Sequence, residues 1–149
     1  MKNATKIIAP AVLLVFIAIQ FYQPAPNISK GQVDTADFIL VNNLSGEIRN
    51  TLKTSCYDCH SNTTKYMWYD YIQPARFLVE YHINAGKEEL NFSEWATYSK
   101  RKQERLLESI RSKIIAKEMP PPSYLFMHNN AELNNNQIEV LTKWLDKQR

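Results

Sequence analysis

The pentapeptide Cys56-Tyr57-Asp58-Cys59-His60 constrains this chain more than any other feature, because it holds both of its cysteines. The spacing is C-x-x-C-H, the attachment signature of c-type haem. Two thiols three positions apart on one helical turn can reach the two vinyl groups of a single porphyrin, and the next residue can place its imidazole beneath the iron. The motif therefore predicts one covalently attached haem c (iron), bound by Cys56 and Cys59, with His60 as the proximal ligand.

Three other chemistries also use paired cysteines, and the rest of the sequence disfavours each of them. A thioredoxin-like redox pair needs a βαβ context, which this sequence lacks. A zinc site needs about four ligands, and there is no second cysteine pair. A disulfide across two intervening residues would close so short a loop that it would stabilise the fold little. Haem attachment is the interpretation that uses both thiols and the adjacent imidazole.

The sixth iron ligand is expected downstream of the motif, where Met119 is followed by three prolines and then by a C-terminal helical segment. This order is similar to that of class I cytochromes c, in which a methionine followed by proline supplies the second axial ligand. We therefore predict Met119 as the distal ligand. Methionine also serves as apolar filler in proteins, and His128, His82 or an open position are the alternatives. Methionine would raise the reduction potential relative to two histidines.

Two expectations concern the surroundings of the predicted haem. His60 should donate its second ring N–H to a backbone carbonyl, which fixes the ring, and residues 72–74 lie at a suitable distance along the chain. Aromatic residues between the motif and Pro74 would either wall the porphyrin or pack in an ordinary core. They are Tyr66, Trp68, Tyr69 and Tyr71.

Residues 1–22 have the order of an export signal: Lys2 and Lys6 without an acidic residue, then an uncharged apolar run. About 15 apolar residues span about 22 Å as a helix, against about 30 Å of hydrocarbon, although a snorkelling Lys6 and an interfacial Tyr22 would narrow the gap. No good A-x-A cleavage site follows. We predict a signal anchor, with a cleaved signal peptide as the alternative, then a linker over 23–40 and a domain over 41–149. The anchor would hold the domain at the inner membrane, facing the periplasm.

After residue 40 nearly the whole chain has helical patterning, without strand alternation. Helices are predicted over about 45–56 and 74–84, the second stopped by Gly86, over 100–117, ended by the prolines, and over 136–147. Outside the leader, the chain has 16 basic and 15 acidic residues. A nearly neutral domain argues against nucleic-acid binding. The basic residues of 100–117 are typical of a solvated helix face, with a docking patch for an acidic redox partner as the alternative.

Several strings of the sequence together resemble the haem-binding domain family of small exported bacterial proteins, which are common in Bacteroidota. These strings are Cys56 to Asn62, Met67 to Tyr69, His82 before Gly86, Asn91 to Trp95, Met119 to Pro121, and Tyr124 with His128. The resemblance covers about residues 40–147. It implies covalent haem binding, with Cys56 and Cys59 as attachment points, His60 as proximal ligand and Met119 as distal ligand. The family often has proline at position 67 and a glycine within 116–118, where this chain has none.

The sequence thus predicts an all-α, class I cytochrome c-like domain around one haem, preceded by a membrane-anchor helix. The predicted function is single-electron transfer with a redox partner protein in or near the inner membrane. Such a protein needs no catalytic acid, base or nucleophile, so we do not expect an enzyme. The alternatives are a haem sensor or small peroxidase-like enzyme, with an open or His128-ligated sixth position, and a structural haem domain within a larger complex.

Overall fold

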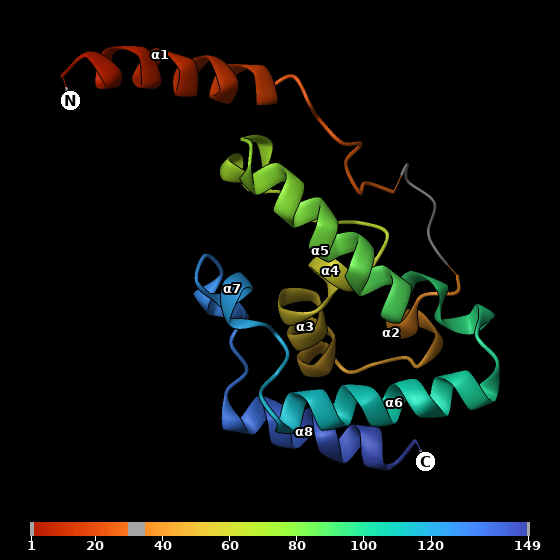
Figure 1. Cartoon of the computed structure of the whole chain (residues 1–149). Coiled ribbons are helices and arrows are strands. Elements are labelled where there is room, and N and C mark those ends of the chain that lie inside the picture. Colours follow the sequence, from red (N-terminus) through yellow and green to blue (C-terminus); the bar gives the residue numbers. More distant parts are fainter. Residues whose placement is uncertain (1, 30–34, 149) are drawn as a thin grey trace.

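The computed structural model describes residues 2–29 and 35–148, and over them every regular element is a helix and no strand is present (Figure 1). This confirms the predicted all-α class. Residues 30–34 of the predicted linker and residue 149 lie outside the described residues. In chain order the elements are α1 (Lys2–Ile19), α2 (Phe38–Val41), α3 (Gly46–Ser55), α4 (Tyr57–His60), η1 (Trp68–Tyr71), α5 (Ala75–Glu89), η2 (Phe92–Thr97), α6 (Lys100–Ile115), α7 (Pro122–Leu125), η3 (Asn129–Ala131) and α8 (Asn135–Asp146).

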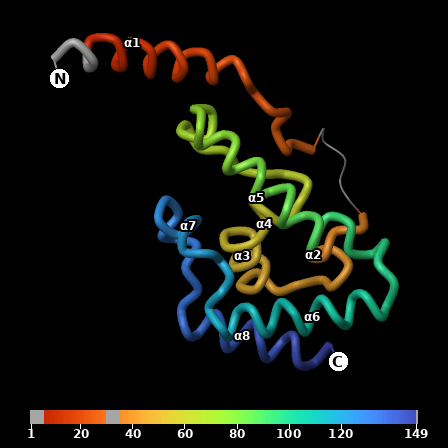
Figure 2. The backbone as a smooth tube through the Cα atoms, in the orientation of Figure 1, coloured from red at the N-terminus to blue at the C-terminus, as the bar shows by residue number. Residues whose placement is uncertain are grey.

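The core lies between α3, η2, α6 and α8, with α6 and α8 side by side along one edge of the domain (Figure 2). Phe38 of the short helix α2 sits at its centre and is 1% exposed. The ring of Phe38 lies 5.0 Å from Phe92, 4.7 Å from Trp95 and 5.6 Å from Trp144, measured between centroids. Tilted and edge-on aromatic pairs of this kind add stability beyond the apolar area that they bury. The core therefore joins segments from both ends of the domain.

Helix α6 ends one turn earlier than the prolines would require. Lys117 N–H donates to the Ile114 carbonyl at 3.1 Å, and Glu118 N–H donates to the Lys113 carbonyl at 3.0 Å. These are the two hydrogen bonds of a Schellman motif. Lys117 has φ of 55°, a left-handed conformation that favours glycine. The backbone itself thus terminates this helix before the prolines are reached.

Helix α5 continues through Gly86 and ends at Glu89, so the prediction that Gly86 stops it is wrong. A β-carbon on Gly86 would lie only 2.8 Å from the backbone carbonyl oxygen of Cys59. Glycine is needed here because α5 and α4 pack backbone against backbone.

Residues 20–29, which we call the strap, lack regular structure but are hydrogen-bonded to the domain. Gln73 N–H donates to the side-chain oxygen of Gln20 at 2.9 Å. At the start of α5, the guanidinium of Arg76 donates to the Pro24 carbonyl at 2.7 Å. The predicted linker is therefore tied at Pro24 to the start of α5.

The strap also contacts the segment that follows the cysteine motif. The side-chain amide of Asn27 donates to the Ser61 carbonyl at 2.8 Å and to the Thr64 hydroxyl at 2.9 Å. The amide oxygen of Asn27 accepts from the Lys87 ammonium at 2.8 Å. One side chain of the strap thus joins the motif region to the second half of α5.

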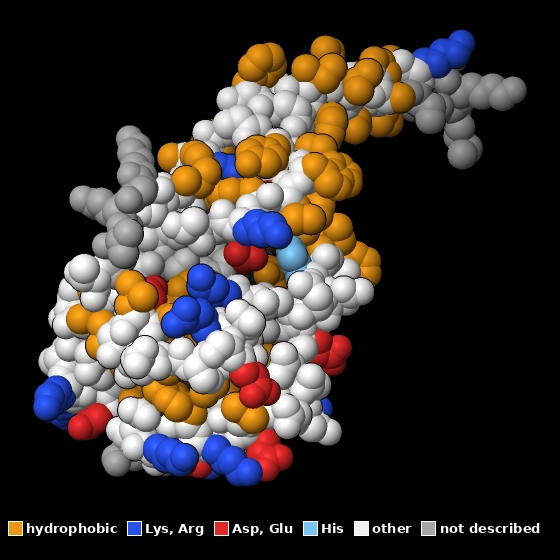
Figure 3. All heavy atoms as spheres, turned by 180° about the vertical axis from the view of Figure 1, so that it is seen from behind, with side chains coloured by type: hydrophobic (Ala, Val, Ile, Leu, Met, Phe, Trp, Pro, Cys, Tyr) orange, Lys and Arg blue, Asp and Glu red, His pale blue; other side chains and the backbone are white. Residues whose placement is uncertain are grey.

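Helix α1 projects from the domain, and Figure 3 shows hydrophobic side chains along it and on the adjoining part of the surface. Within the described residues, no helix has both the length and the apolar character needed to cross a membrane. This finding contradicts the predicted membrane-anchor helix. Helix α1 has 18 residues, about 27 Å at 1.5 Å per residue, and its unbroken apolar run begins only at Ile7.

Candidate functional site

A cavity of about 630 Å³ lies between α4, α5, α6 and the loop after α6. Its volume is typical of small-molecule and cofactor sites, which span about 300–1,000 Å³. All four residues predicted from the sequence line it, namely Cys56, Cys59, His60 and Met119. Much of the remaining lining is apolar: Leu90, Phe92, Leu106, Ile110, Ile114 and Pro120. The structure therefore gathers the predicted ligands at one hollow, although Met119 lies far from the others in sequence.

The cysteine motif forms one helical turn. The backbone N–H groups of Cys59 and His60 donate to the Cys56 carbonyl at 3.2 and 3.0 Å. Both cysteines are free thiols. Burial raises the pKa of Cys56 to about 12, with the Cys59 sulfur adding to the shift, and burial together with the charge of Asp58 raises the pKa of Cys59 to about 11. Both sulfurs are therefore protonated at neutral pH and can lie against apolar groups without a charge penalty.

The imidazole of His60 is held by two backbone carbonyls. Its Nδ1 lies 2.9 Å from the Gly86 oxygen and 3.0 Å from the Leu90 oxygen. Carbonyl oxygens only accept, so Nδ1 carries the proton and the neutral ring keeps its lone pair on Nε2. The prediction of a backbone carbonyl partner is confirmed, but the segment 72–74 is wrong. The partners come from the C-terminal end of α5 and the residue that follows it, and the Gly86 carbonyl also accepts from Leu90 N–H at 2.9 Å.

Gly86 is the functional position that sequence reasoning missed. It lines the cavity, supplies one carbonyl to His60 and lets α5 approach Cys59 closely. The available signal was a glycine inside an otherwise helical pattern, which indicates a close packing contact as well as a helix end.

Met119 lines the cavity and is 41% exposed, so this residue lies at the mouth of the cavity and not deep inside it. His82 of α5 also lines the cavity. His128 is not among the lining residues. Its Nε2 lies 3.1 Å from the hydroxyl of Tyr69 and its Nδ1 lies 3.2 Å from the Tyr124 carbonyl. Of the alternatives to Met119, the structure thus brings His82 to the cavity and engages both ring nitrogens of His128 elsewhere.

The aromatic residues between the motif and Pro74 do not line the cavity. Trp68 is 73% exposed and Tyr71 is 53% exposed, so they neither wall a cofactor site nor pack in the core. Tyr124, which follows the prolines, lines the cavity instead. No local pattern indicated that Tyr124 would line the cavity in place of the earlier aromatic residues, because aromatic residues are spaced alike in loops, cores and cofactor walls.

Part of the basic face of α6 borders the cavity. Arg105 and Lys113 lie two turns apart on this helix and both line the hollow, with Ser109 between them. Lys113 also forms an ion pair with Glu118. The face that the sequence indicated as solvated therefore supplies positive charge at the cavity mouth, where Arg105 and Lys113 are exposed.

The alternatives to haem attachment gain no support from the structure. No strand accompanies the motif within residues 2–29 and 35–148, so a thioredoxin-like context is missing there. In the same part of the chain, no three side chains of His, Cys, Asp or Glu gather as they would for zinc. The motif cysteines do not form a disulfide with each other.

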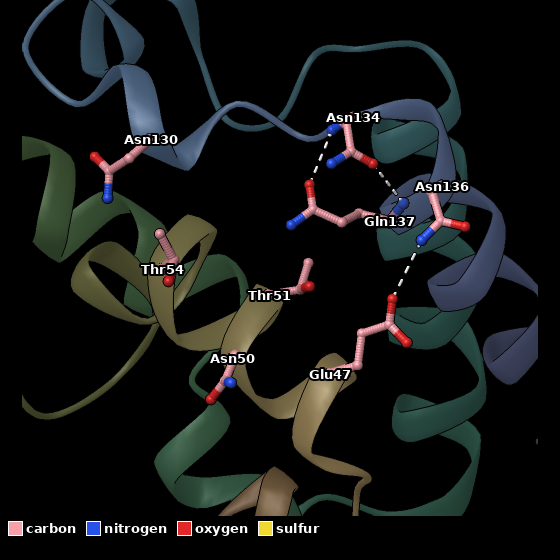
Figure 4. Close-up of a pocket in the computed structure, with 8 residues that line it drawn as sticks. All are labelled: Glu47, Asn50, Thr51, Thr54, Asn130, Asn134, Asn136 and Gln137. Atoms are coloured by element: carbon pink, nitrogen blue, oxygen red, sulfur yellow. Dashed lines mark hydrogen bonds between the residues drawn. The ribbon is translucent and has the colours of Figure 1, made fainter.

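A second hollow, of about 330 Å³, is lined by polar residues, which Figure 4 shows as sticks. Asn134 and Gln137 form the capping box of α8, in which each backbone N–H donates to the other's side chain, at 3.0 and 2.9 Å. Asn136 donates to the Glu47 carboxylate at 3.2 Å. These polar groups serve the helix ends, so the larger cavity is the candidate site. The residues that line the second hollow are Glu47, Asn50, Thr51, Thr54, Asn130, Asn134, Asn136 and Gln137.

Comparison with known proteins identifies a family for this chain. The model of a family described as a haem-binding domain matches residues 14–147, from within α1 to just past the end of α8. No curated protein and no solved structure matches the chain.

Proposed function

Because this chain belongs to the haem-binding domain family, we propose that it holds one c-type haem in the 630 Å³ cavity and transfers single electrons. Cys56 and Cys59 would attach the porphyrin, His60 would be the proximal ligand and Met119 the distal ligand. One observation carries the proposal: two free thiols on one helical turn, an imidazole fixed through Nδ1 and a thioether line the same largely apolar cavity.

The residues present fit such a group. Haem iron, when bound, supplies one-electron oxidation and reduction. The two carbonyls on His60 Nδ1 leave Nε2 as the nitrogen that could bind iron, and they would make the ring a stronger electron-pair donor. Phe92 is 1% exposed and Leu90 is 8% exposed, so these walls exclude water. Burial and ligand identity tune a haem potential, and no side chain has to act as acid or base.

A second candidate function is a haem sensor or a small peroxidase-like enzyme. It is favoured by the place of His82, which lines the cavity, and by the exposure of Met119 at the mouth. A histidine near an open sixth position could move protons to or from a bound small molecule. Carbon monoxide binding to the reduced protein separates the two functions, because a Met–His haem resists it and an open site binds at once.

We further propose that the domain works in the periplasm, with a redox protein in or near the inner membrane as its partner. The order of positive and then apolar residues in the leader supports export. Cell fractionation of the full chain tests this proposal, with the haem protein expected outside the cytoplasm. Recovery of haem-free chain in the cytoplasm would contradict it.

The decisive experiment is an optical spectrum of the full chain matured with the c-type haem machinery, recorded oxidised and then reduced. We expect haem that survives denaturation and acid–acetone extraction, and a weak far-red charge-transfer band from methionine on ferric iron. Met119→Ala should remove the band and keep the covalent haem. Covalent haem without the band would favour the second candidate function, and no covalent haem would overturn both.

A further inference from the structure

Four side chains outside the predicted ligand set tie the segment that carries Met119 to the motif and to η1. We call residues 116–131 the distal segment. Tyr124 donates to the Asp58 carboxylate at 2.8 Å, and the hydroxyl of Tyr69 lies 3.1 Å from Nε2 of His128. The rings of Tyr124 and His128 stack at 4.1 Å between centroids, with 10° between their planes. Both residues of the distal segment thus face partners on other elements.

Asp58 is held firmly enough to serve as an anchor for this tie. It lies between the two cysteines, and its second carboxylate oxygen accepts from Lys65 N–H at 3.1 Å. Its backbone carbonyl accepts from the Thr64 hydroxyl at 2.6 Å. Since burial and the nearby Asp58 charge raise the pKa of Tyr124, its hydroxyl stays protonated and donates. Hydrogen bonds to a carboxylate are about twice as strong as neutral ones.

The chain between Met119 and Tyr124 is stiff, so fixing Tyr124 also restricts the position of Met119. Residues 120–122 are all proline, and proline fixes φ near −65°. Helix α7 begins at the last of these prolines, and Tyr124 lies on that helix. A hydroxyl fixed on Asp58 therefore restricts where the thioether of Met119 can lie.

We propose that Tyr124 and Asp58 form a positioning contact that holds the distal segment against the haem-attachment turn, with His128 and Tyr69 as a second tie. The inference rests on the proposed function, and it assigns His128 a role as a positioning residue and not as an iron ligand. Both ring nitrogens of His128 already have partners, Tyr69 and the Tyr124 carbonyl. Loss of the Tyr124 hydroxyl would free the distal segment, and Met119 would then hold the proposed haem iron less firmly.

The test uses the full haem-loaded chain and the rate at which carbon monoxide displaces the distal ligand of the reduced protein. Tyr124→Phe should raise that rate about tenfold, the effect of one hydrogen bond to a charged group, and weaken the far-red band. Tyr66→Phe is the matched control, because Tyr66 donates to the Glu80 carboxylate at 2.5 Å on the strap side and does not line the cavity. Its rate should stay within about twofold of the parent.

Variants of the acceptor complete the test. Asp58→Asn keeps an oxygen that can accept from Tyr124 but loses the charge that strengthens the contact, so its rate should lie between those of the parent and Tyr124→Phe. Asp58→Leu should match Tyr124→Phe, and the double variant should be no faster than either, because one shared contact is lost in all three.

The outcomes separate the two levels of the proposal. Covalent haem with an unchanged carbon monoxide rate in Tyr124→Phe overturns the positioning contact and leaves the proposed function standing. An equal increase in Tyr66→Phe also overturns it, because the effect would then be general loosening. A bis-histidine spectrum that disappears in His128→Gln would show that His128 is an iron ligand, and it would overturn the inference. Failure of the parent chain to bind haem covalently is the failure of the proposed function itself.

Discussion

The two sides of the cavity are built in different ways. On one side, which we call the proximal frame (residues 56–60 and 75–90), the contacts are made by the backbone: the carbonyls of Gly86 in α5 and of Leu90 just after it hold the His60 imidazole, and Gly86 packs on the Cys59 carbonyl. The distal segment is fixed at its outer end by side-chain tips, through Tyr124 and His128. Contacts made by backbone groups persist when side chains are substituted, whereas a contact between two side chains is lost when either residue is changed. In the proposed haem protein, the attachment turn would thus be fixed by the backbone and the sixth position would be adjustable.

The largest effect should come from removing the attachment points. In a Cys56→Ser, Cys59→Ser double variant we expect complete loss of haem from denaturing gels stained for haem peroxidase activity, because no thioether can form. Met119→Ala should keep its stained band and change only the optical spectrum. If Met119→Ala lost covalent haem as fully, the two sides would not differ as described.

The next largest effect concerns the start of the helix that holds His60. The side chains of Arg76 and Glu80 are 2% and 8% exposed and form an ion pair at 3.2 Å. Arg76→Ala leaves the carboxylate buried without its cation and should lower the free energy of unfolding by about 3–5 kcal/mol. Arg111→Ala breaks an exposed pair with Asp146 and should cost at most about 1 kcal/mol. Urea unfolding measures both, and similar costs would contradict the buried role of Arg76.

Adding a methyl group at Gly86, where α5 crosses α4, tests the contact between α5 and the Cys59 carbonyl. Gly86→Ala should lower the free energy of unfolding by about 1–3 kcal/mol, because the new β-carbon meets the rigid Cys59 carbonyl at 2.8 Å. A β-carbon on Gly46 of α3 would meet nothing within 4 Å. Gly46→Ala should therefore be neutral or stabilise by up to about 1 kcal/mol. A gain in both variants, seen by thermal unfolding, would rule out the crossing contact.

The smallest effect is a stabilisation at the start of the distal segment. Lys117 has φ of 55°, and Lys117→Gly should raise the free energy of unfolding by about 1 kcal/mol, because a left-handed conformation costs a side-chain-bearing residue about that much. Asn43 has φ of 45°, and Asn43→Gly should gain less, because asparagine tolerates this region. Calorimetric melting distinguishes them, and a destabilised Lys117→Gly would mean that its side chain has a role of its own.

The sequence predicted the parts of the site that depend on neighbours along the chain. The spacing of Cys56, Cys59 and His60 follows from one helical turn, and the prolines after Met119 identify a stiff loop. Helical periodicity likewise indicated the all-α class. In each case the physical cause acts within a few residues, so pattern alone suffices.

The rest depends on how helices cross, which no local pattern records. The partners of His60 lie 26 and 30 residues away, because α5 passes over α4 at Gly86. Tyr124 reaches the cavity from beyond the prolines, and Asn27 brings the strap onto the motif region. Such contacts arise from tertiary packing, so residues 72–74 and the aromatic loop were reasonable but wrong choices.

The ties of the distal segment span much more of the chain than those of the proximal frame. They join residues 59 and 66 positions apart, whereas the carbonyls that hold His60 lie 26 and 30 positions away. Closing a longer loop costs more entropy, so near neighbours meet earlier during folding. The proximal frame around His60 would then form while the distal segment is still unattached. The flat, bulky haem could enter the cavity during that interval, and the folded protein would need no opening wide enough to admit it.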